Sequence, residues 1–212
     1  VYWGVGVDMC NISNSFLVNS HNGRLDGSTT MDANQTYHFF LGYHPGTGDL
    51  EFGCVPNSST YFDSATLQPK NVVAAASGYL WLYAGSLRAD SSGDLYEFEM
   101  ECDTIWYNDQ AGLEVLNTSN LSTSSANTVD FATPKGLPCR ILGHVNGFYG
   151  SDAAWLQIGP SSSAFRLCSS TAGSEDRGNP FDFVVDDSTL NVWASPVSAA
   201  VGLRTLGFKM EV

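Results

Sequence analysis

The stretch Leu95–Tyr107, LYEFEMECDTIWY, decides the fold class. Aromatic and other apolar residues alternate there with acidic ones, namely Tyr96, Phe98, Met100, Cys102 and Trp106 against Glu97, Glu99, Glu101 and Asp103. A period of two is typical of a β-strand with one buried and one solvated face. We therefore predict that Phe98, Met100 and Trp106 lie in a core and that the glutamates face water.

A second strand precedes this one. Tyr79–Tyr83 is apolar on both faces, as a central strand would be, and Ser91–Asp94 supplies turn residues between the two. We expect the two strands to form a hairpin.

The rest of the chain repeats short alternating runs between clusters of Gly, Pro, Asn, Asp and Ser. Further strands are expected at Tyr37–Tyr43, Arg140–Val145, Ala154–Ile158, Phe165–Cys168, Phe181–Val185, Leu190–Ala194 and Arg204–Val212. Many strands with almost no helix predict an all-β fold, an antiparallel β-sandwich or jelly roll. Residues 117–128 are nearly devoid of apolar side chains, which favours two β modules, 1–107 and 129–212, joined by a linker or long loop at 108–128.

Composition and charge exclude several classes of protein. Of the 212 residues, 43% are hydrophobic and only 15% are charged, which argues against disorder and against coiled coils. The 9 basic residues face 22 acidic ones, a net charge of −13, so direct nucleic-acid binding is not expected. No apolar run approaches the ~18 residues of a membrane span. The chain opens without Met in a strand-like run, 1–7, which we interpret as a processed product or a fragment.

The cysteines and sequons leave alternatives open. Five cysteines without a CxxC spacing argue against a zinc ribbon, and we expect mostly reduced, buried thiols, with Cys102 and Cys139 in the core. Sequons for N-glycosylation occur at Asn11, Asn34, Asn57, Asn117 and Asn120, although a chain rich in Asn, Ser and Thr also produces them by chance.

No catalytic, phosphate-binding or metal-binding motif is present, and we expect no enzyme activity and no cofactor. The carboxylates of Glu97, Glu99 and Glu101 have a spacing that a jelly-roll glycosidase could use, but the neighbouring aromatic residues point to the other face. Acidic pairs in turns could hold Ca²⁺, and we expect them instead to cap those turns: Glu175, Asp176, Asp186 and Asp187. The histidines at 21, 38, 44 and 144 are expected to be ordinary core or surface residues.

The stretch 79–107, with the run GYLWLYAGSLRADSSGDLYEFEMECDTIW at residues 78–106, resembles the last two strands of jelly-roll coat proteins of small icosahedral RNA viruses, tombusvirus-like ones above all. Gly93-Asp94-Leu95 supplies the entry to the final strand. The resemblance implies a shell-type domain followed by a hinge and a protruding β module. The stretch at 181–212 is similar to β-sandwich modules of viral surface proteins.

The leading hypothesis is therefore a non-enzymatic virus structural protein, a capsid (coat) or spike fragment in the virion. Its expected partners are copies of itself in a symmetric assembly and a host receptor or glycan. The alternative is a secreted, lectin-like carbohydrate-binding module, for which Trp155 and Trp193 are candidate contacts because each has the parity opposite to its apolar neighbours. A jelly-roll glycosidase is a third and weaker hypothesis.

Overall fold

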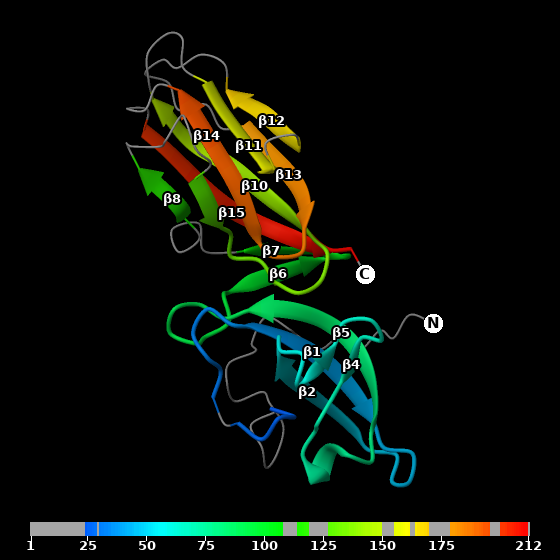
Figure 1. Ribbon diagram of the computed structural model, residues 1–212. Coiled ribbons are helices and arrows are strands. Elements are labelled where there is room, and N and C mark those ends of the chain that lie inside the picture. The colour runs from blue at the N-terminus through cyan, green and yellow to red at the C-terminus, as the bar shows by residue number, and fades with distance from the viewer. Residues whose placement is uncertain are drawn as a thin grey trace. The chain divides into compact units, whose positions relative to one another are not determined.

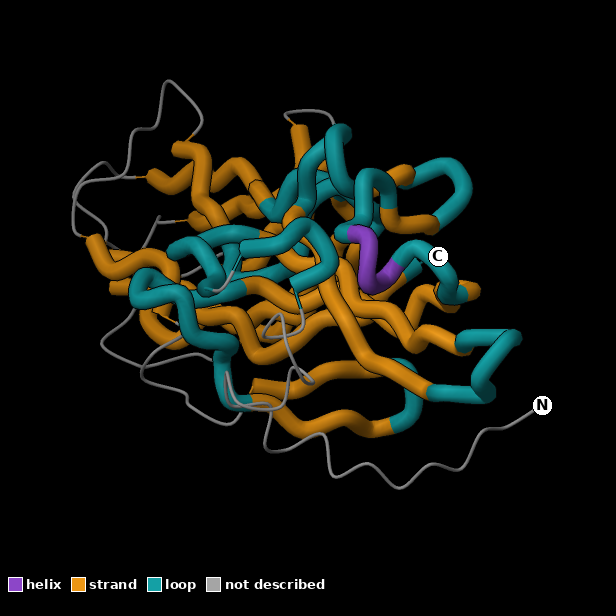
Figure 2. The backbone as a smooth tube through the Cα atoms, turned by 90° about the horizontal axis from the view of Figure 1, so that it is seen from below, coloured by secondary structure: helices purple, strands orange, loops and turns teal. Residues whose placement is uncertain are grey.

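The regular secondary structure of the described residues is β-strand, apart from one short 3₁₀ turn (Figure 2). The computed structural model describes residues 24–28, 30–107, 114–118, 127–149, 155–161, 164–169, 179–195 and 200–211. Its elements are β1 Thr36–Tyr43, β2 Leu50–Pro56, β3 Phe62–Asp63, β4 Gln68–Pro69, the 3₁₀ turn η2 Ala74–Ala76, β5 Leu80–Arg88, β6 Phe98–Glu101, β7 Thr104–Tyr107, β8 Glu114–Thr118, β9 Asn127–Asp130, β10 Cys139–Tyr149, β11 Trp155–Ser161, β12 Ala164–Ser169, β13 Asn179–Val185, β14 Thr189–Ser195 and β15 Ala200–Met210.

The chain divides into two compact units, Val1–Glu99 and Met100–Val212. This division differs from the ranges expected from the sequence. β7 lies within the range expected for the first module, yet it pairs with β15 of the second unit. β8 lies within the expected linker and pairs with β15 as well.

The second unit is an antiparallel β-sandwich, as the sequence predicts. One sheet has the order β13-β10-β15-β7-β6, with β8 also paired to β15, and the other has the order β12-β11-β14-β9 (Figure 1). Both sheets contribute to one buried hydrophobic cluster, for example Ile141 and Leu203 from the first sheet and Ile158 and Val192 from the second. Burial of such alternating side chains is what holds two sheets face to face.

The first unit contains an antiparallel sheet of order β2-β1-β5 and the short ribbon β3–β4. One face of this sheet carries buried Phe40, which packs edge-on against Tyr83 and lies against Phe62. The backbone of Arg24 forms a bridge with Cys54 on the edge strand β2. The Arg24 guanidinium forms an ion pair with Asp26 at 2.6 Å and lies over the Tyr37 ring. Within the described residues, the first unit therefore shows one principal sheet and a ribbon.

The stretch Leu95–Tyr107 is two strands and not one. Cys102 adopts a left-handed conformation (φ 56°) and, with Asp103, forms the tight turn between β6 and β7. The turn reverses the parity, so that Ile105 and Tyr107 are buried. Phe98 is buried as predicted, but the predictions that Met100, Trp106 and Cys102 lie in the core are wrong: Met100 is 48% exposed, Trp106 is 36% exposed, and Cys102 is exposed.

The predicted hairpin between Tyr79–Tyr83 and Leu95–Tyr107 is also wrong. Tyr79–Tyr83 is largely contained in β5, which pairs with β1 and not with β6 or β7. Only an isolated bridge joins Ala89 to Leu95 beyond the turn. The expectation that this strand is buried on both faces fails as well, because Leu80 and Leu82 are more than 60% exposed.

Candidate binding surfaces of the first unit

An aromatic cluster with acidic neighbours lies at the end of the first sheet where β1 turns into β2. It consists of His44, Asp49, Glu51, Tyr79 and Trp81, and is called the Tyr79 cluster below. The His44 and Tyr79 rings meet edge-on with centroids 5.0 Å apart, and the Tyr79 and Trp81 centroids are 5.4 Å apart. The three rings are partly exposed, so this cluster presents aromatic surface to solvent.

Glycines make room for the rings. Gly42 lies directly opposite Trp81 across the β1–β5 pair, and a Cβ at Gly42 would come within 2.5 Å of the indole carbon Cζ3. The indole therefore rests on bare backbone, and its Nε1–H donates to the carbonyl of Ala76 at 3.3 Å. A Cβ at Gly78 would likewise meet Nε2 of His44 at 2.5 Å.

The β1–β2 turn holds the polar side of the cluster. The backbone N–H of Thr47 donates to Nδ1 of His44 at 3.2 Å, and the Thr47 hydroxyl donates to a carboxylate oxygen of Asp49 at 2.5 Å. The main chain closes the turn through His44 N–H to Asp49 O at 2.9 Å. These bonds fix the imidazole and the carboxylate before any ligand arrives, which lowers the entropic cost of binding.

The acidic side chains act on the tyrosine. Glu51 lies opposite Gly42 on β2, in the same cross-strand row as Trp81. Partial desolvation and the hydrogen-bonded carboxylate of Glu51 raise the pKa of Tyr79, and Asp49 adds to the effect. The cluster thus combines an aromatic surface with carboxylate acceptors, a pairing suited to a ligand with apolar C–H faces and hydroxyl or ammonium donors.

The opposite face of the same sheet is apolar and is called the apolar face below. Its members alternate with those of the Tyr79 cluster along the strands and occupy two cross-strand rows, Leu80–Tyr43–Leu50 and Leu82–Leu41–Phe52. Leu50 and Leu80 are 64% exposed, Leu82 is 61% exposed and Tyr43 is 45% exposed. Isolated exposed leucines are common on protein surfaces, but these side chains are neighbours on three adjacent strands and form one contiguous apolar patch.

A chain of hydrogen bonds runs through the core of the first unit, and sequence patterning gave no sign of it. Nδ1 of His38 lies 2.7 Å from the Ser86 hydroxyl, which is also 2.7 Å from the Tyr83 hydroxyl. Nε2 of His38 lies 3.2 Å from the Asn57 carbonyl oxygen, so Nε2 carries the proton and Nδ1 accepts from Ser86. Phe62 stacks on the imidazole with centroids 3.6 Å apart.

The order hydroxyl–imidazole–carboxamide in this chain matches that of a nucleophile, a base and an orienting group. Ser86 is 1% exposed and His38 is fully buried, so a substrate atom has no access to the hydroxyl. Burial lowers the pKa of His38 to about 4, against the smaller opposing effect of the bond to Asn57. We therefore assign the chain a structural role, in which it satisfies polar groups inside an aromatic core.

The glutamates considered for catalysis, Glu97, Glu99 and Glu101, are all exposed, as the prediction that they face water requires. Glu99 and Glu101 lie on β6, and Glu97 lies just before it. The face does not assemble the paired, differently buried carboxylates of a glycosidase.

The positions chosen for glycan contact or metal binding fall only partly within the described residues. Trp155 and Trp193 occupy strand positions with parity opposite to buried Leu156 and Val192, and the register pairs Trp193 with Gln157. The side chains of both tryptophans lie outside the described residues, as do Glu175 and Asp176. Asp187 caps its turn through the backbone N–H of Thr189 at 3.0 Å, and Asp186 is exposed.

The sequons have different environments. Asn34 is exposed in a turn with φ 58°, whereas the carboxamide of Asn57 faces the buried His38. Asn11 and Asn120 lie outside the described residues, and Asn117 lies on β8 with its side chain not described. Among the described residues, no group of three or more His, Cys, Asp or Glu side chains is placed to hold a metal ion, and no helix has the length and hydrophobicity needed to cross a membrane.

Comparisons with known proteins give little information about function. No known protein family matches the sequence, and no curated protein is similar to it. Among solved structures, the chain is similar to the N-terminal CBM22-1–CBM22-2 tandem domain of Xyn10C from Paenibacillus barcinonensis, with 9% sequence identity, a TM-score of 0.26, and coverage of 85% of this chain and 74% of that one. At this TM-score the similarity supports no inference about function.

Proposed function

We propose that the protein is a non-catalytic, extracellular β-sandwich module that binds carbohydrate through the Tyr79 cluster. The observation that carries the proposal is the partly exposed aromatic surface of Tyr79 and Trp81 beside the carboxylate of Glu51. Pyranose rings present C–H faces that pack on aromatic rings, and their hydroxyl groups donate to carboxylates.

The charge of the cluster limits the class of sugar. Glu51 and Asp49 both act on Tyr79, and the chain carries a net charge of −13. Uronic and sialic acids would bring a further negative charge against these carboxylates, at a cost of several kcal/mol for like charges in close contact. The expected ligands are therefore neutral glycans or glycans that contain amino sugars.

Affinity electrophoresis and calorimetry test the proposal with soluble neutral, amino-sugar and uronate polysaccharides. We expect retardation by neutral or amino-sugar polymers, loss of binding in Tyr79→Ala, and at least tenfold weaker binding in Glu51→Gln. Trp106→Ala is the matched control, because Trp106 is an exposed aromatic residue on β7 of the second unit. Absence of binding to all three classes of polymer, or an equal loss in Trp106→Ala, would refute the proposal.

A second candidate is a structural protein of a virus particle, in which this chain packs against its own copies and contacts a host receptor. The apolar face favours it, because shell subunits bury such surfaces against neighbours. The resemblance of residues 79–107 to coat proteins points the same way. Sedimentation of the native material decides between the candidates, since a shell has a mass in the megadalton range and a secreted module does not.

A further inference from the structure

We propose that the apolar face of the first sheet is an interface with a second copy of this chain, packed face to face about a two-fold axis. The proposal does not depend on carbohydrate binding, because the apolar face and the Tyr79 cluster lie on opposite faces of the sheet. It supplies the contact surface that the particle-forming candidate needs.

The register defines the surface. Tyr43, on the central strand, lies opposite Leu50 on one side and Leu80 on the other. The next row, Leu82–Leu41–Phe52, lies one pleat along, about 7 Å away. Three strands spaced about 4.8 Å apart give a flat apolar patch of two rows and three columns. Four of the seven large hydrophobic side chains exposed among the described residues belong to it.

The absence of charged side chains on the apolar face favours contact with a second copy there over contact through other surfaces of the chain. None of the six side chains of the apolar face is charged, while the chain as a whole carries −13. Two copies repel each other through most surfaces, and an uncharged patch is where that repulsion is least. A two-fold axis brings the same patch of both copies together, and a patch that is apolar throughout is complementary to itself.

The area suits a weak dimer. The exposed fractions of Tyr43, Leu50, Leu80 and Leu82, with about 200 Å² for a large side chain, give roughly 400–500 Å² of accessible surface on each copy. The total buried by two copies is then roughly 800–1,000 Å², at the lower limit for a specific interface and in the range of a weak one. Sheets packed about 10 Å apart would form a sandwich between copies like the one that the second unit forms within a chain. We therefore expect a dissociation constant in the micromolar range.

The test is sedimentation velocity of the full chain over a concentration series, with charge variants of Tyr43. Wild type should shift from monomer to dimer as concentration rises through the micromolar range. Tyr43→Glu and Tyr43→Lys should each remain monomeric, because like charges would meet near the two-fold axis. An equimolar mixture of the two should dimerise again, since the opposite charges then pair across the interface.

Val184→Glu and Val184→Lys are the matched controls, because Val184 is 44% exposed on β13 of the second unit and takes the same charge changes. These variants should associate as wild type does. A wild-type chain that stays monomeric up to 1 mM would overturn the proposal, and would mean that another segment of the protein or a different macromolecule covers the face. Equal disruption by the Val184 variants, or failure of the mixture to dimerise, would overturn it as well.

Discussion

His38 should make the first unit lose stability in mild acid. Its pKa is lowered by burial from 6.5 to about 4, so between these values the unfolded chain binds a proton that the folded chain does not. Stability therefore falls as pH decreases from 6.5 towards 4, and it is independent of this group above 6.5. Each pH unit in the window corresponds to 1.36 kcal/mol, so the full effect is about 3 kcal/mol, of which about 2 kcal/mol is lost between pH 6.5 and 5.

The range from pH 7 to pH 5 is favourable for the measurement because most carboxylates titrate at lower pH. The salt-bridged Asp26 has its pKa lowered by Arg24, which outweighs the raising effect of burial, and so it contributes only in stronger acid. Urea unfolding should be followed at pH 7.0 and pH 5.0 through methyl NMR signals of β1 and β5, which isolate the transition of the first unit. Wild type should lose about 2 kcal/mol more than His38→Gln, whose carboxamide can still bond to Ser86.

Equal losses in wild type and His38→Gln would refute the reasoning, since the acid sensitivity would then come from other groups. A second measurement covers the case in which the variant does not fold. In the wild-type protein, the ring signals of His38 should not titrate above pH 5, and a midpoint near 6.5 would show that the imidazole is hydrated and that the buried hydrogen-bonded chain is wrong.

Three further predictions concern packing and thiol chemistry. Gly42→Ala should cost about 1–3 kcal/mol in thermal unfolding, because its Cβ would overlap the Trp81 indole, and the cost should largely vanish in a Trp81→Ala background. Tyr107→Phe should cost about 1–2 kcal/mol in urea, because the Tyr107 hydroxyl donates a buried bond to the carbonyl of Ala132; no change would mean that water reaches this site. Iodoacetamide followed by peptide mapping should modify Cys102 in the native protein and spare Cys54 and Cys139, whose pKa values burial raises to about 12; labelling of Cys54 before unfolding would contradict the packing.

The sequence was informative wherever alternation and turn chemistry agreed. The predicted strands at Phe181–Val185 and Leu190–Ala194 correspond to β13 and β14, because the Asp186–Ser188 turn between them uses residues that cap their own backbone. The all-β sandwich class followed from the number of such runs and their spacing. Side-chain parity in these strands is set locally, so the sequence shows which residues are buried.

The prediction that Leu95–Tyr107 forms a single strand is wrong for a physical reason. Gly or Asn normally indicates a hairpin turn in a sequence, because these residues tolerate a positive φ. Here Cys102 adopts that conformation instead. An acidic–apolar alternation that continues through the turn hides the reversal. The partners that stabilise the hairpin lie outside the stretch: Lys209 of β15 forms an ion pair with Asp103 at 2.6 Å, and the carbonyl of Ala132 accepts a hydrogen bond from the buried Tyr107. These are tertiary contacts, which no local pattern contains.

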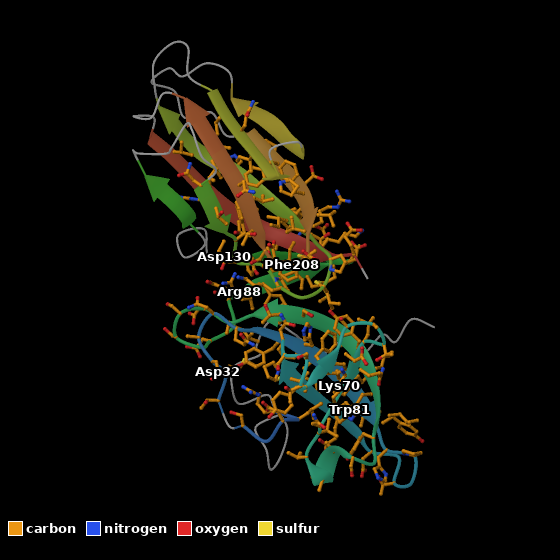
Figure 3. The ribbon with its side chains drawn as sticks, in the orientation of Figure 1. Asp32, Lys70, Trp81, Arg88, Asp130 and Phe208 are labelled. Carbon is orange, nitrogen blue, oxygen red and sulfur yellow. The ribbon has the colours of Figure 1, made fainter. Side chains whose placement is uncertain are left out.

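The two candidate surfaces could be predicted from the sequence only in part, because the sequence identifies the strand but not which of its faces is covered. Every position of Tyr79–Tyr83 is apolar, which predicts a central or sandwiched strand. The structure separates the positions by parity: Trp81, labelled in Figure 3, packs against the backbone of Gly42, whereas Leu80 and Leu82 are exposed to solvent. Which face of β5 is covered depends on residues far from it in the sequence, such as Gly42 of β1 beneath Trp81 and Phe62 of β3 beside Tyr83. Because the two surfaces lie on opposite faces of the same sheet, substitutions at Tyr43 and at Tyr79 can separate self-association from carbohydrate binding in the same molecule.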